Sequence, residues 1–531
     1  MSNKTIFKNM LRIPALTVAL LMFSCDLVID ETDSLITEGP SDVFNGVENP
    51  ASSVDNLYNA ITSQMATQEE LYALTEVTTD EQVVPTRGTD WGDNGLWRTL
   101  HAHTWGPTHK FITDLWNNKN AAVLRATEII DPLSNANAEQ IAHAKFMRAY
   151  NMWLVMDSFG QVPFRNPTDG PDVTPDVMTR QEAYAYIVQD LEDAIAGLPA
   201  SVPTATSKTR AAKATARWLL AKVKLNAIVY NGAYGDGDLQ DVIDLVDEIE
   251  AEGYALVDGN YFDLFAGPDF SNTDVIWALA TDVSSKMWNS LHYSQGEFIP
   301  NSEGAGTNAG GGWNGFTTLA EFYDKFEGPS ETNVINSGQE ERRGYTHTLE
   351  STNADNEGFG FGFQLGQMYG WRDGAAVALE ARGGKSLIFT KELPGLVGNN
   401  DVTGIRLLKY SPANGSGVLG TVIARFADAH LMRAEAMLRL GDAGPALTEV
   451  NELRSMRDET SELGALDEAA LLDERGRELY LEFVRRNDLI RFGAFKNAWE
   501  FKEAGDGHTD LFPIPASAIL SNPGLTQNTG Y

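Results

Sequence analysis

VIARFADAHLMRAEAMLRLGDAGPALTEVNELRSMR, residues 422–457, has the pattern of two helices joined by a short turn. Apolar side chains recur at intervals of three and four residues, as they do on one face of an amphipathic helix. Gly441 and Gly444 interrupt the pattern where a turn is expected. The predicted inner face carries Val422, Phe426, Ala429, Met432, Ala436 and Leu440 before the turn, and Ala446, Val450 and Leu453 after it. Many of these residues are small, so the stretch predicts two closely packed helices.

Two earlier stretches have the same helical periodicity. HAKFMRAYNMWLVMDSFG (residues 143–160) and RAAKATARWLLAKVKLNAIVYNG (residues 210–232) repeat apolar residues at i, i+4 and i+7 or i+8. Trp153 and Trp218 fall at core positions of these patterns, and we predict that both are buried. The stretches are therefore interpreted as packing helices.

The fold class follows from these patterns. A helix, a glycine turn and a second helix make up a tetratricopeptide-like hairpin, although the chain keeps no strict repeat of about 34 residues. We predict a mostly α fold, in which helical hairpins over about residues 51–250 and 421–531 form a scaffold. The scaffold supports an irregular, loop-rich half with short β-strands.

The loop-rich half is expected at about residues 251–420, which are rich in Gly, Asn and aromatic residues. NSEGAGTNAGGGWNG (residues 301–315) cannot sustain a helix because of its glycines. DVIWALA (residues 274–280) and KSLIFTK (residues 385–391) predict short strands. Loops on a rigid scaffold are where binding residues concentrate, so the function is expected here and in residues 80–107.

The N-terminus has the pattern of a bacterial lipoprotein signal. Basic residues precede an eleven-residue apolar run, residues 13–23, that is too short to span a membrane but suits a signal peptide. Cys25, the single cysteine, follows this run and Ser24, as in a lipobox. We predict a signal peptide at residues 1–24, lipidation of Cys25, an acidic leader at residues 25–50 and a single body at residues 51–531.

The net charge limits the ligands. The chain has 40 Lys and Arg residues against 74 Asp and Glu residues, a formal charge of −34. Such a field repels phosphate backbones, which argues against nucleic-acid binding. Neutral ligands are not disfavoured.

Three motifs resemble those of the SusD/RagB family. LFPIPASAILSNPGLTQNTGY (residues 511–531) resembles the closing signature of the family. DERGRELYLEFVRRNDLIRFG (residues 473–493) resembles its Glu-Arg-x-x-Glu-Leu helix and the Asp-Leu-Ile-Arg run that follows. KFMRAYNMWLVMDSFGQVPF (residues 145–164) resembles its Arg-Ala-Tyr helix, which ends in Gly-x-Val-Pro.

The resemblance implies a SusD-like fold and a function without catalysis. Members of this family are outer-membrane, cell-surface lipoproteins that capture polysaccharide or oligosaccharide. They deliver the glycan to a SusC-like TonB-dependent transporter. The resemblance therefore implies a lipid-anchored glycan-binding protein that is not an enzyme and uses no cofactor.

Residues 89–107, TDWGDNGLWRTLHAHTWGP, contain the first candidate glycan-binding residues. Sugar rings present apolar C–H faces and hydroxyl groups, so a binding site needs flat aromatic faces beside polar side chains. Trp91 and Trp97 are expected to stack on sugar rings, because the nearby glycines prevent a rigid helix from burying both indoles. Asp90 and Arg98 are expected to bind hydroxyl groups, and Trp105 is interpreted as part of a structural turn.

The loop-rich half supplies the other candidates. Trp313 follows three glycines and precedes Asn314, while Trp288 lies in KMWNSLHYSQG. We expect Trp313 and Trp288 to stack on sugar and Asn314 to bind hydroxyl groups. A neutral β-glucan such as laminarin is the predicted ligand, and starch or mannan would fit the same pattern.

Two other functions stay open at this point. A surface glycoside hydrolase or lyase would need a specific carboxylate pair, and none stands out among 74 acidic residues. A peptide-capturing lipoprotein of the same group would use a similar aromatic cleft. No metal site is predicted, because His101, His103 and His109, like the acidic DGDLQD turn that starts at Asp236, lack the ligand pattern of a known site.

Overall fold

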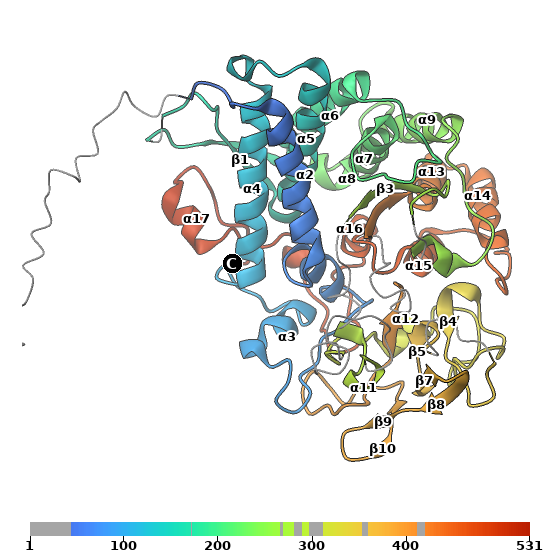
Figure 1. Cartoon of the computed structure of the whole chain (residues 1–531). Helices are drawn as coiled ribbons and strands as arrows, with labels where there is room; N and C mark the ends of the chain where they lie inside the picture. The colour runs from blue at the N-terminus through green and yellow to red at the C-terminus, as the bar shows by residue number, and fades with distance from the viewer. Residues whose placement is uncertain are drawn as a thin grey trace, which may run out of the picture. The chain divides into compact units, whose positions relative to one another are not determined.

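The computed structural model describes residues 44–531 with six gaps, and Figure 1 shows it. The gaps are residue 171 and residues 266–268, 281–288, 297–311, 353–358 and 411–419. The predictions for the signal peptide, for Cys25 and for Trp288 lie outside the described residues.

The chain divides into two compact units. The small unit comprises Met1–Phe44 and Thr168–Asp172, and its described residues form no helix or strand. The large unit comprises Asn45–Pro167 and Val173–Tyr531, and the description below concerns this unit alone.

The N-terminal part of the large unit is a series of helices that pack in sequence order. α4 packs on α5, α5 on α6, α6 on α7 and α7 on α9, and α2 lies against α4 and α5 (Figure 1). Asn137 and Thr179 form capping boxes at the starts of α5 and α6. The helices are α2 (Pro50–Ala66), α3 (Leu96–His101), α4 (Lys110–Ile130), α5 (Ala138–Phe159), α6 (Arg180–Gly197), α7 (Lys213–Leu225), α8 (Ala227–Asn231) and α9 (Asp238–Ala251).

The C-terminal part contains the helical hairpin predicted for residues 422–457. α13 (Phe426–Leu440) packs on α14 (Ala443–Ser455), and Gly441 ends α13 in the left-handed conformation. The later helices are α15 (Glu468–Leu479), α16 (Arg485–Arg491) and α17 (Ala516–Ser521). The prediction of a mostly helical fold is therefore confirmed.

Two residues of the predicted hairpin face were placed wrongly. Val422 belongs to strand β13 (Thr421–Arg425), which pairs antiparallel with β3 (Val275–Leu279). Leu440 is exposed at the last turn of α13. The strand pairing joins residues about 145 positions apart, so local periodicity carries no sign of it.

The segment between α9 and β13 holds most of the strands as small antiparallel sheets. β12 (Arg406–Leu408), β5 (Phe361–Gln364) and β4 (Gly344–Tyr345) form one sheet, and β7 (Tyr369–Arg372) pairs with β8 (Ala375–Ala378). The other pairs are β6 (Gly366–Gln367) with β11 (Ile388–Phe389) and β9 (Glu380–Ala381) with β10 (Lys385–Ser386). Two short helices, α11 (Tyr293–Gly296) and α12 (Ala320–Tyr323), lie in the same segment, while β1 (Gln161–Phe164) and β2 (Asp176–Thr179) pair in the scaffold.

The closing sequence motif ties the C-terminus to the scaffold. The Tyr531 hydroxyl accepts a hydrogen bond from Trp105 Nε1 at 2.7 Å and donates to the Leu511 carbonyl. Asn528 Nδ2 donates to the carbonyls of Phe159 and Phe512. Trp105 is buried by these contacts, so its interpretation as a structural residue is confirmed.

Within the part of the chain that the structure describes, no helix has the length and apolar character needed to cross a membrane.

Candidate functional site

The two regions expected to carry the function meet at Trp91. The Trp91 indole Nε1 donates a hydrogen bond to the Trp313 carbonyl at 2.9 Å. Gly315 makes this approach possible, because a Cβ atom at Gly315 would lie 2.2 Å from Trp91 Cε2. Residues more than 220 positions apart therefore form one surface feature.

Two of the candidate tryptophans keep accessible indoles. Trp313 is 48% exposed, and Trp91 is half-buried. The Trp91 ring packs edge to face on Phe316 and Trp97, with ring centroids 5.3 Å and 5.8 Å apart. These contacts fix the Trp91 ring at the surface, where a ligand can reach it from solvent.

Trp97 has a different role from the predicted one. It is only 3% exposed and packs against Phe111 and Phe316 in the main hydrophobic core. Its Nε1 donates to Asp93 Oδ2 at 2.9 Å. The predicted sugar-stacking role is therefore wrong for Trp97, because α3 turns its indole inward and leaves no free face. The Trp97 ring instead packs against the Trp91 ring and supports it.

Asn314 is also a supporting residue. It is 4% exposed, and its Oδ1 accepts a hydrogen bond from Arg406 Nη2 at 2.8 Å. Its Nδ2 donates to the Asp401 carbonyl at 3.0 Å. Both ends of the amide are engaged, so the prediction that Asn314 binds hydroxyl groups is wrong in this conformation.

Left-handed backbone conformations concentrate in these two loops. Trp91, Asn94 and Asn314 have φ values of 57°, 51° and 52°. For a bulky residue such as Trp91, this conformation costs of the order of 1 kcal/mol or more. Strain of this kind persists where surrounding contacts fix a side chain in a required position, which supports a functional role for the Trp91 loop.

Asp90 and Arg98 are both accessible beside Trp91. Asp90 Oδ2 lies 3.3 Å from Arg382 Nη1, and both side chains are largely in solvent. Arg98 is half-buried, and its Nη1 donates to Thr86 Oγ1. The structure therefore leaves Asp90 and Arg98 near the exposed indoles, and their contact with hydroxyl groups stays a prediction.

Tyr293 and Arg382 are site residues that the sequence did not single out. The Arg382 guanidinium carbon lies 4.3 Å from the centroid of the Tyr293 ring. Burial raises the pKa of Tyr293, and the carboxylates of Asp401 and Asp90 raise it further, so the hydroxyl stays protonated. The sequence signal that could have indicated Tyr293 is its position as an aromatic residue shortly before the glycine-rich residues 301–315. Arg382 also lies 3.3 Å from Asp90, the residue before Trp91, which links Tyr293 to the Trp91 loop. We give the name aromatic face to this group of neighbouring residues, Trp91, Trp313 and Tyr293.

Buried arginines hold the loops of the aromatic face. Arg87 Nη1 donates to the carbonyls of Asn400 and Thr403 at 2.9 Å and 2.8 Å, and its Nε donates to the Gly315 carbonyl. Burial lowers the pKa of Arg87 to about 9, so the side chain remains charged at neutral pH. Arg406 makes similar contacts with the carbonyls of Thr403 and Gly404. The face therefore rests on a rigid support.

The histidines of residues 101–109 are structural. His101, His103 and His109 each use Nε2 on a backbone carbonyl: those of Glu500, Thr78 and Leu96. Burial lowers the pKa of all three, so they are neutral. Each of the three rings is thus held by the backbone carbonyl of a different residue.

One group with metal-binding side chains occurs in the described part of the chain, at His430, Glu449 and Glu452. Arg433 already occupies this position, because its Nη2 lies 2.8 Å from Glu449 Oε2 and 3.3 Å from His430 Nδ1. A guanidinium at this place supplies the positive charge that a metal ion would bring. The residues therefore do not fit a metal site.

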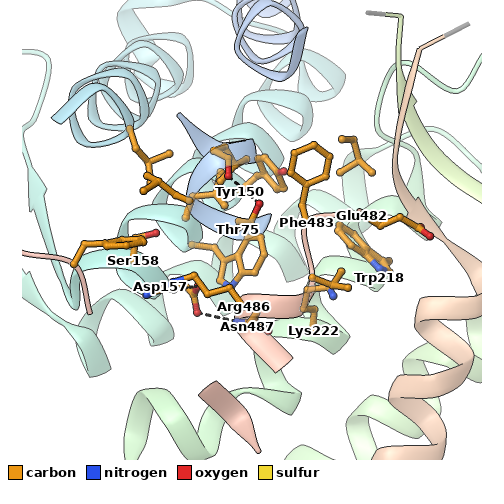
Figure 2. Close-up of a pocket in the computed structure, with 18 residues that line it drawn as sticks. Thr75, Tyr150, Asp157, Ser158, Trp218, Lys222, Glu482, Phe483, Arg486 and Asn487 are labelled. Atoms are coloured by element: carbon orange, nitrogen blue, oxygen red, sulfur yellow. Dashed lines mark hydrogen bonds and ion pairs between the residues drawn. The ribbon is translucent and has the colours of Figure 1, made fainter. Parts of the chain in front are cut away.

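An interior cavity lies in the helical scaffold, and Figure 2 shows its lining. Tyr150, Trp153 and Trp218 contribute apolar walls, and Asn487 Nδ2 donates to Asp157 Oδ1 at 2.8 Å beside them. The cavity volume of about 30 Å³ fits about one water molecule. It is too small for a sugar ring.

An open groove of about 580 Å³ lies elsewhere on the large unit. Its lining comes from parts of the segments 259–262, 335–345 and 458–459, and the charged side chains that line it are acidic: Glu340, Glu341, Asp458 and Glu459. Its lining shares no residue with the aromatic face and contains no tryptophan. The aromatic face is therefore the better match for the apolar faces of a sugar.

Comparison with known proteins defines the class. Residues 273–531 match the model of the SusD family, and residues 35–225 match a model described as "Starch-binding associating with outer membrane". Together the two matches span most of the chain, and the chain belongs to the SusD/RagB family.

Two curated relatives are similar over most of their length. The starch-binding protein SusD of Bacteroides thetaiotaomicron is 27% identical over 429 residues, which are 74% of this chain and 73% of that protein. A SusD-like protein, P25, of Formosa agariphila is 24% identical over 79% of this chain and 80% of its own length.

Solved structures have the same fold. A SusD-like protein from Bacteroides fragilis superimposes with a TM-score of 0.70, at 19% identity, over 92% of this chain and 98% of that one. Surface glycan-binding protein A from Bacteroides thetaiotaomicron, in complex with laminarihexaose, superimposes with a TM-score of 0.64 at 18% identity, over 90% of this chain and 98% of that one. At these identities the similarity concerns the fold.

Proposed function

We propose that this chain is a cell-surface protein that captures neutral glycan on the aromatic face. The observation that carries the proposal is the hydrogen bond from the Trp91 indole to the Trp313 backbone carbonyl, which brings two solvent-accessible tryptophans from distant parts of the chain to one place. Membership of the SusD/RagB family supports the same function.

The chemistry of the aromatic face suits a sugar chain. Indole and phenol rings offer flat apolar surfaces to the C–H faces of pyranose rings, with about 1 kcal/mol gained at each aromatic contact. Asp90 and Arg98 supply an acceptor and a donor for hydroxyl groups. Because each contact contributes little, the affinity for short oligosaccharides is expected to be low and to rise with chain length.

Two glycan classes are candidates. The curated relative SusD is named as a starch-binding protein, and one similar structure holds laminarihexaose. A neutral β-glucan such as laminarin remains the proposed ligand, and starch is the alternative. The net charge of −34 disfavours uronate polymers in either case.

The proposed location and partner come from the family. The matched model is described as associating with the outer membrane, which agrees with the lipobox-like position of Cys25. We propose that the lipid anchor holds the protein at the cell surface and that a SusC-like TonB-dependent transporter receives the glycan.

A binding role is proposed in place of catalysis. Two buried polar side chains that support the aromatic face, Arg87 and Asn314, are engaged in hydrogen bonds to backbone carbonyls. A glycosidase would instead need two carboxyl groups facing one sugar bond.

Native affinity gels and a reducing-sugar assay test this function. Gels that contain laminarin, starch, xylan, mannan or alginate are run with the purified protein, and the same polysaccharides are assayed for released reducing ends. We expect retardation in laminarin or starch with no release of sugar. Turnover of a polysaccharide, or migration unaffected by all five, would contradict the proposal.

A further inference from the structure

A short hairpin formed by β9 and β10 carries Arg382 in its turn, and the Arg382 side chain contacts Tyr293 and Asp90. In this hairpin, Ala381 of β9 pairs with Lys385 of β10, and Gly383 and Gly384 adopt left-handed conformations in the turn. Ser294 Oγ donates to the Glu380 carbonyl at 2.5 Å, which ties the base of the hairpin to α11. Arg382 is therefore held beside Tyr293 by the backbone around it.

The Arg382 side chain makes two contacts at the aromatic face. Its guanidinium lies over the Tyr293 ring at 4.3 Å, and its Nη1 lies 3.3 Å from Asp90 Oδ2. The Arg382 side chain is 61% exposed and that of Asp90 is 49% exposed. Exposed cation–π contacts and exposed ion pairs are both weak, so solvent or a ligand can replace them.

These two contacts are of the same kind that a sugar would make. A guanidinium is flat, lies against an aromatic ring and presents N–H donors at its edge. A pyranose ring lies against the same kind of ring through its C–H face and presents O–H donors. The Arg382 guanidinium therefore lies where the C–H face of a sugar would contact the Tyr293 ring. Its N–H groups face the Asp90 carboxylate, as a sugar hydroxyl group would.

We infer that Arg382 is an internal competitor for glycan, which must leave Tyr293 and Asp90 before a sugar can bind there. This inference rests on the proposed function. Arg382 then determines specificity, because a ligand that displaces it must contact both the Tyr293 ring and the Asp90 carboxylate. A ligand that makes only one of these contacts does not recover the interaction energy that Arg382 gives up. A neutral sugar with a hydroxyl group beside its C–H face meets this requirement.

The ion pair gives the inference a distinctive salt dependence. Salt screens exposed charges, so it weakens the pair between Arg382 and Asp90. A neutral glycan has no charge of its own to be screened. Glycan affinity of the unaltered protein should therefore increase with salt, and this increase should disappear when Arg382 is replaced.

Isothermal titration with laminarihexaose and maltohexaose at 20 mM and 500 mM NaCl tests the inference. We compare affinities for whichever of the two oligosaccharides the unaltered protein binds. Arg382→Ala should bind it about three- to tenfold more tightly than the unaltered protein at low salt, and its affinity should not depend on salt. Lys385→Ala, which removes the same charge from the same hairpin, should behave like the unaltered protein. Equal or weaker binding by Arg382→Ala would overturn the inference, since it would make Arg382 a bystander or a direct ligand of the sugar.

The outcome separates this inference from the proposed function. If the unaltered protein binds glycan and replacement of Trp91 and Trp313 weakens it, while Arg382→Ala does not tighten it, only the inference fails. If neither oligosaccharide binds any variant and all polysaccharide gels leave migration unchanged, the proposed function fails and the inference fails with it.

Discussion

At the scale of single residues, glycine controls the position of the candidate site. Gly315 leaves the space that the Trp91 ring fills, and a Cβ atom there would lie 2.2 Å from Trp91 Cε2. Such a distance is far inside van der Waals contact, so either the ring or the backbone would have to move. The site thus depends on a residue that cannot itself bind a sugar.

Gly315→Ala should abolish most glycan retention without unfolding the protein. The added methyl group displaces the Trp91 indole and breaks its hydrogen bond to the Trp313 carbonyl. Affinity-gel migration measures the effect, and Gly106→Ala is the matched control, since no neighbouring atom lies within 4 Å of a Cβ at Gly106. Unchanged retention of Gly315→Ala would show that the Trp91 position is not needed.

A buried carboxyl pair makes stability depend on pH. Glu76 Oε1 accepts a hydrogen bond from Phe483 N, Glu81 Oε2 accepts one from Leu481 N, and the two carboxyl groups contact each other. Burial raises the pKa of Glu76 to about 7 and raises that of Glu81 as well, although Lys409 and Arg485 lie nearby. The pair therefore keeps a proton in the folded protein that it loses in the unfolded chain.

The sign of the pH effect follows from these raised pKa values. The stability due to the proton is fully present below the unfolded pKa of about 4.5 and is lost as the pH rises through about 7. Urea unfolding at pH 6 and pH 8.5 should show a loss of roughly 1–3 kcal/mol for the unaltered protein. Glu76→Gln replaces one of the two titrating carboxyl groups with a neutral side chain and should lose less stability, because only Glu81 is left to titrate. An equal loss in both proteins would contradict the assignment.

At the scale of elements, the family motif in α15 and α16 builds a buried charge network. Glu478 pairs with Arg425 and Arg457 at 2.8 Å and with Arg342 at 3.2 Å. These guanidinium groups hold the pKa of Glu478 well below its usual range, against the effect of burial. The motif that marks the family in the sequence thus has a structural role, because Glu478 makes its ion pairs in the buried interior.

Glu478→Ala should destabilise the protein by about 3–5 kcal/mol, because it leaves three buried arginines without their shared partner. Glu468→Ala on the same helix is the control, since Glu468 is exposed and pairs with Arg439 at 3.5 Å; its cost should stay below about 1 kcal/mol. Chemical denaturation compares the two. A cost for Glu478→Ala as small as that of the control would show that the network adds little.

The sequence predicted the elements where local periodicity carries the information. The helical hairpin and its Gly441 turn follow from spacing alone, and so does the burial of Trp153 and Trp218. Val422 was misplaced because its strand pairs with residues far away in the chain. Tertiary pairing of this kind overrides a helical pattern at its edge.

At the scale of the whole large unit, the candidate site is an assembly of distant loops. The sequence indicated both Trp91 and Trp313, because indoles among glycines favour display at the surface. It could not show which indole of a close pair turns inward, and Trp97 proved to be the buried one. Arg382 and Tyr293 were missed because their proximity exists only in the folded chain.

The most direct test of the account is the affinity of a double variant, Trp91→Ala with Trp313→Ala, for the polysaccharide that the gels identify. We predict at least a tenfold loss of affinity by isothermal titration, since two aromatic contacts of about 1 kcal/mol each are removed. Trp371→Ala, which removes a partly exposed indole of β7, should bind within about twofold of the unaltered protein. Unchanged affinity of the double variant, with its folding intact, would contradict the claim that the aromatic face binds glycan.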